Sequence, residues 1–173
     1  LRQYIPRTQA YVARLFQVAL ERSRRLKYNP AGGILHFHAI DIWPSATMAA
    51  IDFYRQPTQA FYTVQRSFAP VLASLEYFRD HWRPGEEVQC GVWAINDEWY
   101  EIPNARILWS IADSHDRVAQ KGEFPVTMAA DSSHKLGEVR WTAGDPGTYQ
   151  LRAQVLDSSG KQLSENLFEF EIR

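Results

Sequence analysis

The stretch Gly32-Gly33-Ile34-Leu35-His36-Phe37-His38-Ala39-Ile40-Asp41-Ile42-Trp43-Pro44 determines how the rest of this chain is interpreted. Two glycines release the chain from what precedes them, a short apolar run follows, and Pro44 ends the run. An apolar run of this kind, bounded by Gly and Pro, is typical of a strand buried on both faces in a parallel sheet or a barrel. The sequence therefore predicts a buried strand over residues 34–42.

Helical patterns lie on both sides of this predicted strand. Apolar residues at the spacing of one helix face, followed by basic residues, predict a helix over residues 6–25. Pro57 opens a second apolar-faced segment and Pro70 forbids its continuation, which predicts a helix between them. Helix, buried strand, helix is the repeating unit of a (β/α)8 barrel, and one such unit cannot close a barrel. We therefore interpret residues 1–70 as a helix-strand-helix remnant of such a barrel.

From residue 71 onward the apolar residues alternate with a period of two, which predicts strands. The predicted strands cover residues 72–78, 88–95, 105–111, 124–128, 137–141, 149–156 and 167–172. Turn-forming residues follow at 83–86, 96–98, 144–147 and 157–160. About seven strands in about a hundred residues are typical of an immunoglobulin-like β-sandwich. The predicted fold is thus mainly β, with a sandwich over residues 71–173.

Composition excludes several classes of function. The 173 residues carry a formal net charge of -1, so no overall positive field attracts phosphate groups, and we expect no nucleic-acid partner. No apolar run approaches the roughly 20 residues of a membrane span, so we expect no membrane partner. Cys90 is the only cysteine, which excludes an intrachain disulfide and a cysteine-based zinc site, and we expect a buried, inert thiol. We expect no cofactor.

Four segments of the chain resemble motifs of a known protein family. They are Ile40-Asp41-Ile42-Trp43-Pro44, Ala50-Ile51-Asp52-Phe53-Tyr54-Arg55, Pro57-Thr58-Gln59-Ala60-Phe61-Tyr62 and Arg66-Ser67-Phe68-Ala69-Pro70-Val71-Leu72. This part of the chain resembles the end of the catalytic barrel in family two glycoside hydrolases, which include β-mannosidases, β-galactosidases and β-glucuronidases. The region from Val71 onward resembles the sandwich that follows the barrel in these enzymes. Phe37-His38 stands where the family often has Trp-Gln, so the sugar is left open.

The resemblance implies that this chain does not contain the catalytic residues of the family. Retaining glycosidases use two carboxyl groups about 5 Å apart, one as nucleophile and one as acid and then base. In this family both are glutamates on earlier barrel strands, which this chain does not contain. We therefore expect a C-terminal fragment of a retaining β-glycosidase that is not catalytic alone. It would support the barrel and contribute part of the active-site wall.

The resemblance also implies which residues face the sugar. Asp41 and Trp43 lie at the C-terminal end of the predicted strand, where barrel active sites are built, so Trp43 could stack on a sugar and Asp41 could bind a hydroxyl group. The alternative is that Trp43 packs under the following helix and Asp41 caps it. His38 could contact a sugar hydroxyl or pack in the barrel. A metal site on His36 and His38 has no third ligand nearby, so we expect no metal.

Other interpretations remain open. The sandwich could be an autonomous carbohydrate-binding or adhesion module, with the first 70 residues as an extension. Asp41 and Asp52 could form a carboxylate pair, although they are only eleven positions apart; Asp52 is more simply a residue that binds backbone amides. The acidic and aromatic residues 96–101 could be a carbohydrate-binding rim or a solvated loop. The expected partners are carbohydrate, the rest of the barrel and, for the isolated chain, other copies of itself.

Overall fold

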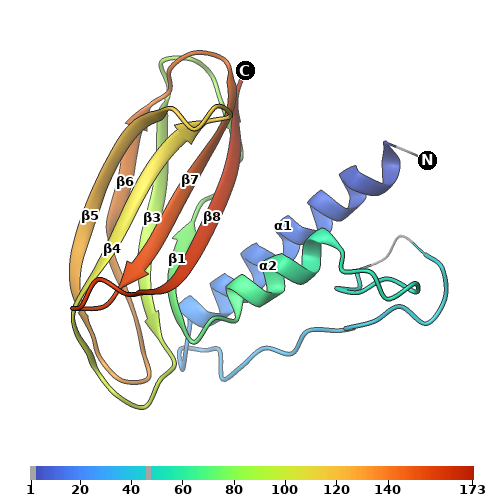
Figure 1. Cartoon of the computed structure of the whole chain (residues 1–173), viewed down its shortest axis with the longest axis horizontal. Coiled ribbons are helices and arrows are strands. Elements are labelled where there is room, and N and C mark those ends of the chain that lie inside the picture. Colours follow the sequence, from blue (N-terminus) through green and yellow to red (C-terminus); the bar gives the residue numbers. More distant parts are fainter. Residues whose placement is uncertain (1–2, 46–47) are drawn as a thin grey trace. The chain divides into compact units, whose positions relative to one another are not determined.

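The computed structural model describes residues 3–45 and 48–173 (Figure 1). The chain divides into two compact units, Leu1–Ala69 and Pro70–Arg173, and each is described by itself. Within the described residues, no helix has both the length and the apolar character needed to cross a membrane.

The described residues of the first unit form two helices, α1 (Tyr4–Arg25) and α2 (Gln59–Ser67), close to the predicted ranges. Val12 and Leu20 of α1 and Ala60 of α2 are buried, because the apolar residues repeat at helical spacing and form one face. Arg22, Arg24 and Arg25 occupy the last turn of α1, where cations complement the helix dipole.

Arg24 also forms hydrogen bonds with the C-terminal end of α2. Its guanidinium is buried and donates hydrogen bonds to the carbonyl oxygens of Ser67 and Ala69, the latter at 2.8 Å. These carbonyls lie at the C-terminal end of α2, where a helix leaves its last oxygen atoms without partners in the helix. Arg24 thus joins the ends of the two helices with charge-assisted hydrogen bonds.

The predicted buried strand over residues 34–42 is wrong for this chain. The segment makes no strand ladder and contributes only an isolated bridge between Ile40 and Ile51. Leu35, Phe37 and Ile42 are 97%, 80% and 75% exposed. The reason is physical: a strand buried on both faces needs neighbouring strands, and the described residues of this unit supply none.

The second unit is a β-sandwich of eight strands. They are β1 (Val71–Glu76), β2 (His81–Trp82), β3 (Glu87–Asn96), β4 (Ile102–Asp113), β5 (Val118–Met128), β6 (Ser132–Thr142), β7 (Gly147–Leu156) and β8 (Gln162–Ile172). One sheet has the order β1-β3-β6 and the other β2-β8-β7-β4-β5, and Figure 1 shows them as two layers. All pairs are antiparallel except β2 with β8. The predicted sandwich is confirmed.

Alternate residues of the strands fill the space between the sheets. The core contains Val92, Ile107, Leu151 and Phe168, all at most 1% exposed, and Cys90 is buried among them as expected. One polar residue also connects the layers: the buried amide Nδ2 of Asn166 on β8 donates to the carbonyl of Ala73 on β1, at 2.9 Å. A buried amide is tolerated here because its hydrogen bonds are made.

Candidate functional site

Two of the three predicted site residues are in direct contact in the first unit. The Nε2 atom of His38 lies 3.0 Å from Oδ1 of Asp41, and Asp41 is only 5% exposed. The backbone holds Asp41 in place, since its N–H donates to the carbonyl of Ile51 at 3.0 Å and the N–H of Ile51 donates to Ala39 at 2.9 Å. The carboxylate is therefore fixed by its own backbone and oriented by a histidine ring.

Thr58 connects the segment at Ala49 and Ala50 to the start of α2. It precedes the helix as the N-cap residue, yet its hydroxyl makes no cap hydrogen bond and instead donates to the carbonyl oxygens of Ala49 and Ala50. Its N–H donates to Ala50 as well, at 3.0 Å. Because Asp41 is hydrogen-bonded to Ile51, which follows Ala50, these bonds position Asp41 relative to α2. A binding site requires such support from a rigid element.

A cavity of about 320 Å³ opens beside these groups, at the lower end of the range of small-molecule pockets. Asp41, Asp52, Tyr54 and Thr58 are among the residues that line it. Its remaining lining residues are Tyr4, Ile5, Thr8, Gln9, Pro44, Ser45 and Phe53. The cavity combines carboxylate, hydroxyl and amide groups with aromatic surface, which suits a polyhydroxylated ligand.

Trp43, the third predicted residue, is 60% exposed and does not line this cavity. Asp52 lines the cavity but is also used locally: its Oδ1 accepts the N–H of Gln56 at 2.8 Å. The expectation that Asp52 binds backbone amides is confirmed. The same bond closes the turn that precedes α2.

His36 lies two residues before His38 and has a different environment. Its ring packs edge-on against Phe16, with centroids 4.4 Å apart. Burial lowers the pKa of His36 below its usual value, a hydrogen bond with the backbone of Met48 opposes this, and the nearby His38 lowers it further. Among the described residues, no group of three His, Cys, Asp or Glu side chains could hold a metal ion.

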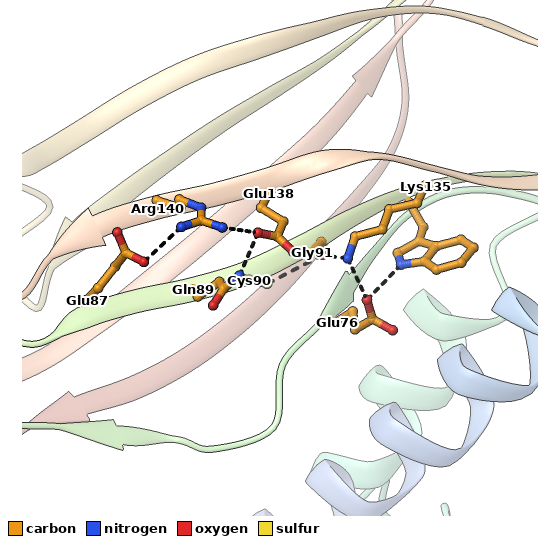
Figure 2. Close-up of polar contacts among 9 residues, drawn as sticks. Glu76, Glu87, Gln89, Cys90, Gly91, Lys135, Glu138 and Arg140 are labelled. Carbon is orange, nitrogen blue, oxygen red and sulfur yellow. Dashed lines mark hydrogen bonds and ion pairs between the residues drawn. The ribbon is translucent and has the colours of Figure 1, made fainter.

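The densest charge network of the sandwich lies on the three-stranded sheet (Figure 2). Glu138 accepts hydrogen bonds from Gln89 at 2.5 Å, Lys135 at 3.1 Å and Arg140 at 2.8 Å. These donors, with Gln89 the largest contributor, lower the pKa of Glu138 to about 2. Lys135 also bridges to Glu76 at 3.3 Å. The network holds β1, β3 and β6 together across their surface, and we assign it a structural role.

The loop between β3 and β4 presents aromatic side chains to solvent. Trp99 and Tyr100 are 85% and 61% exposed, and the chain around them is held by the buried Asn96. Sequence reasoning named residues 96–101 as a rim or a solvated loop. It missed that Asn96 is a buried anchor, because its partners Met128 and Ala129 are distant in sequence.

Comparison with known proteins identifies the sandwich. The family model of the mannosidase Ig/CBM-like domain matches residues 88–171. The chain contains a C-terminal-like domain of family two glycoside hydrolases. Strands β3 to β8 of this family two domain thus lie within the matched residues or overlap them.

Individual relatives agree with this assignment. The chain is 22% identical over 149 residues to β-mannosidase B of Thermothelomyces thermophilus, a match of 77% of this chain and 17% of that protein. The exo-chitosanase of Amycolatopsis orientalis matches with a TM-score of 0.75 and 18% identity, over 95% of this chain and 19% of that one. The β-D-mannosidase of Dictyoglomus thermophilum matches with a TM-score of 0.71 and 22% identity, over 94% and 19%. The chain therefore spans less than a fifth of the length of these relatives, and the structural likeness shows the fold.

Proposed function

We propose that this chain is the C-terminal part of a larger retaining β-glycosidase, in which it supports the catalytic barrel and forms part of the active-site wall. The relatives named above are glycosidases about five times its length. On this proposal the catalytic glutamates belong to other barrel strands, and the chain alone does not hydrolyse glycosides.

The exposed apolar segment around residues 34–43 carries the proposal. Leu35, Phe37, Ile42 and Trp43 are 97%, 80%, 75% and 60% exposed. Burying a large apolar side chain is worth about 1.5–3 kcal/mol, so exposing four of them is costly for an autonomous domain. Neighbouring barrel strands would cover Leu35, Phe37 and Ile42, and bound sugar would cover Trp43. Without them, we expect the isolated chain to associate with copies of itself through this segment.

The carboxylates of the first unit support a binding role better than a catalytic one. A retaining mechanism needs one carboxylate free to attack and another free to transfer a proton, about 5 Å apart. Asp41 is buried against His38, and Asp52 accepts the N–H of Gln56 within its own turn. Both are held in place, as groups that orient a substrate hydroxyl would be.

We assign the binding roles as follows. Asp41 accepts a hydrogen bond from a sugar hydroxyl, and His38 fixes the direction of its carboxylate. Trp43 stacks its ring on the apolar face of the sugar. The names of the relatives make a terminal β-mannoside or β-glucosaminide the substrates to test first.

The experiment is the Trp43→Ala substitution in the longer protein that we propose. Loss of a stacking contact should lower kcat/KM by a factor that corresponds to about 1–3 kcal/mol of transition-state stabilisation. The melting temperature should stay nearly unchanged. Tyr11→Ala, which removes another exposed aromatic ring of the same unit, is the control and should leave both quantities alone. A large fall in melting temperature with full activity per folded molecule would show instead that Trp43 is a core residue.

One observation favours a second candidate function, an autonomous carbohydrate-binding module. The sandwich has its own continuous core and matches an Ig/CBM-like family model. The intact mass of the native protein separates the two candidates: a polypeptide several times longer than 173 residues supports the fragment, and one of this length supports the module.

A further inference from the structure

The segment after α1 alternates between half-buried and exposed side chains. Ile34, His36 and His38 are half-buried, whereas Leu35 and Phe37 between them are exposed. Successive side chains of an extended chain point in opposite directions, so the two histidines share the inner side of the segment. Their two environments differ, and the difference concerns how each ring can accept a proton.

His36 contacts both α1 and the loop that follows the segment. Its ring packs edge-on against Phe16 of α1, with the centroids 4.4 Å apart, and makes a hydrogen bond with the backbone of Met48. The Nε2 atom of His36 is buried and has no hydrogen-bond partner among the described residues, so the bond with Met48 belongs to Nδ1. A proton added to Nε2 would therefore create a buried N–H group without an acceptor.

Among the described residues, no carboxylate is paired with His36. On the α1 side, Val12 and Leu20 lie one helical turn from Phe16 and are apolar. The buried charged side chains of this helix bond within the helix or to the end of α2: Glu21 and Arg24. The ionisable group whose charge acts on His36 is His38, and two protonated rings repel each other.

His38 can hold a proton more easily than His36. Its Nε2 atom lies 3.0 Å from Oδ1 of Asp41, so a protonated His38 has a carboxylate partner. The ring of Phe16 attracts a cation only weakly, whereas a buried N–H group without an acceptor costs more. The neutral form of His36 is therefore the form that fits the packed segment.

We propose that His36 is a pH-sensitive contact, which holds the segment that carries Asp41 against α1 while its ring is neutral and releases the segment when the ring is protonated. The effect reaches Asp41 through the backbone, because Asp41 and Ala39 are both hydrogen-bonded to Ile51. Burial lowers the pKa of His36 below 6.5, the hydrogen bond with Met48 opposes this, and the charge of His38 adds to it. The released ring therefore takes up a proton more readily than the packed ring, so the packed segment is stable above about pH 6.5 and loses stability below it.

This inference goes beyond the proposed function, because it concerns a property of the chain's own fold. If Asp41 binds a sugar hydroxyl as proposed, release of the segment would weaken that binding in acid. The experiment below uses no sugar, so its failure would leave the proposed function untouched.

The test is hydrogen exchange of the whole chain at pH 7 and pH 5, corrected for the effect of pH on the chemical exchange rate. The quantity measured is the protection of the backbone N–H groups of Asp41 and Ile51, which form the bridge. We expect this protection to fall between the two pH values by at least about threefold and at most about 25-fold, since the released ring titrates near pH 6.5. The N–H groups of the sandwich should keep their protection.

Two substitutions remove the titration of residue 36 in different ways. His36→Phe keeps a ring against Phe16, and His36→Asn keeps a donor for the backbone of Met48. Neither new side chain titrates between pH 5 and pH 7, so the protection should be the same at both values. His115→Asn is the matched control: it makes the same chemical change at an exposed position of the sandwich, and the loss of protection should remain.

Three results would overturn the proposal. One is equal protection of Asp41 and Ile51 at pH 7 and pH 5 in the unaltered chain. Another is a loss of protection that persists in the variants of His36, which would place the sensor at another group such as His38; if one variant has no protection at pH 7, the other decides. The third is a loss that depends on protein concentration or extends equally to the sandwich, since association or global unfolding would then be what responds to pH.

Discussion

Replacement of Asn96 by Asp tests the anchor of the β3–β4 loop. The two amide protons of Asn96 serve the carbonyl oxygens of Tyr100, Met128 and Ala129, and the side chain has no access to solvent. A carboxylate of the same shape cannot donate, so at least two hydrogen bonds are lost. A buried group left without its partner costs about 1–3 kcal/mol, which gives about 2–6 kcal/mol for the substitution.

The assay is urea unfolding of the chain at neutral pH, followed through the signal of the sandwich, with a thermal melt in parallel. A loss of at least about 2 kcal/mol corresponds to a melting temperature lower by about 10 °C in a domain of this size. Asn104→Asp is the matched control, because Asn104 is exposed at the start of β4 and undergoes the same chemical change. If Asn96→Asp is no more destabilising than Asn104→Asp, Asn96 does not anchor this loop.

Two further substitutions test the charge network and the helix junction. The pKa of Glu138 is lowered to about 2, so the stability that its carboxylate contributes is present above pH 5 and is lost as the pH falls toward 2. The urea midpoint of Glu138→Gln should therefore fall less between pH 6 and pH 3 than that of the unaltered chain. Glu101→Gln, on an exposed loop, should leave that pH dependence unchanged, and equal behaviour of the two variants would refute the role of the network. Arg24→Met should speed hydrogen exchange of α2 by an amount equivalent to about 2–3 kcal/mol, because the carbonyls of Ser67 and its neighbour lose a charged donor. Arg22→Met, an exposed change in the same turn, should have little effect, and equal protection in both variants would contradict the junction.

Local patterns were sufficient to predict most of the sandwich. Each predicted strand overlaps an observed one, from β1 to β8, because alternation of apolar residues records which face of a strand is buried. Only β2 was missed, since two residues, His81 and Trp82, are too few to show a period. The turn at residues 157–160 closes as expected, with the N–H of Gly160 donating to Asp157 at 3.0 Å.

The prediction over residues 34–42 was wrong for an instructive reason. Its apolar composition describes a strand in a sheet, but composition does not say whether the neighbouring strands belong to the same chain. Local sequence patterns also could not predict contacts between residues that are far apart in the sequence. Examples are Gln89 with Glu138, 49 residues apart, and Asn96 with Ala129, 33 residues apart. At the candidate site, the sequence predicted His38 and Asp41, and their mutual contact emerged only from the structure.

An assay for hydrolysis of aryl β-glycosides by the isolated chain tests whether this chain is a non-catalytic part of a larger glycosidase. The assay would offer β-mannoside, β-galactoside, β-glucoside, β-glucosaminide and β-glucuronide substrates to the purified 173-residue chain. We expect no turnover above the buffer, because in the proposed function the chain contributes binding groups while the catalytic carboxylates belong to the rest of the enzyme. Robust turnover that is abolished by Asp41→Asn or Asp52→Asn would contradict it, since these residues would then be the catalytic pair.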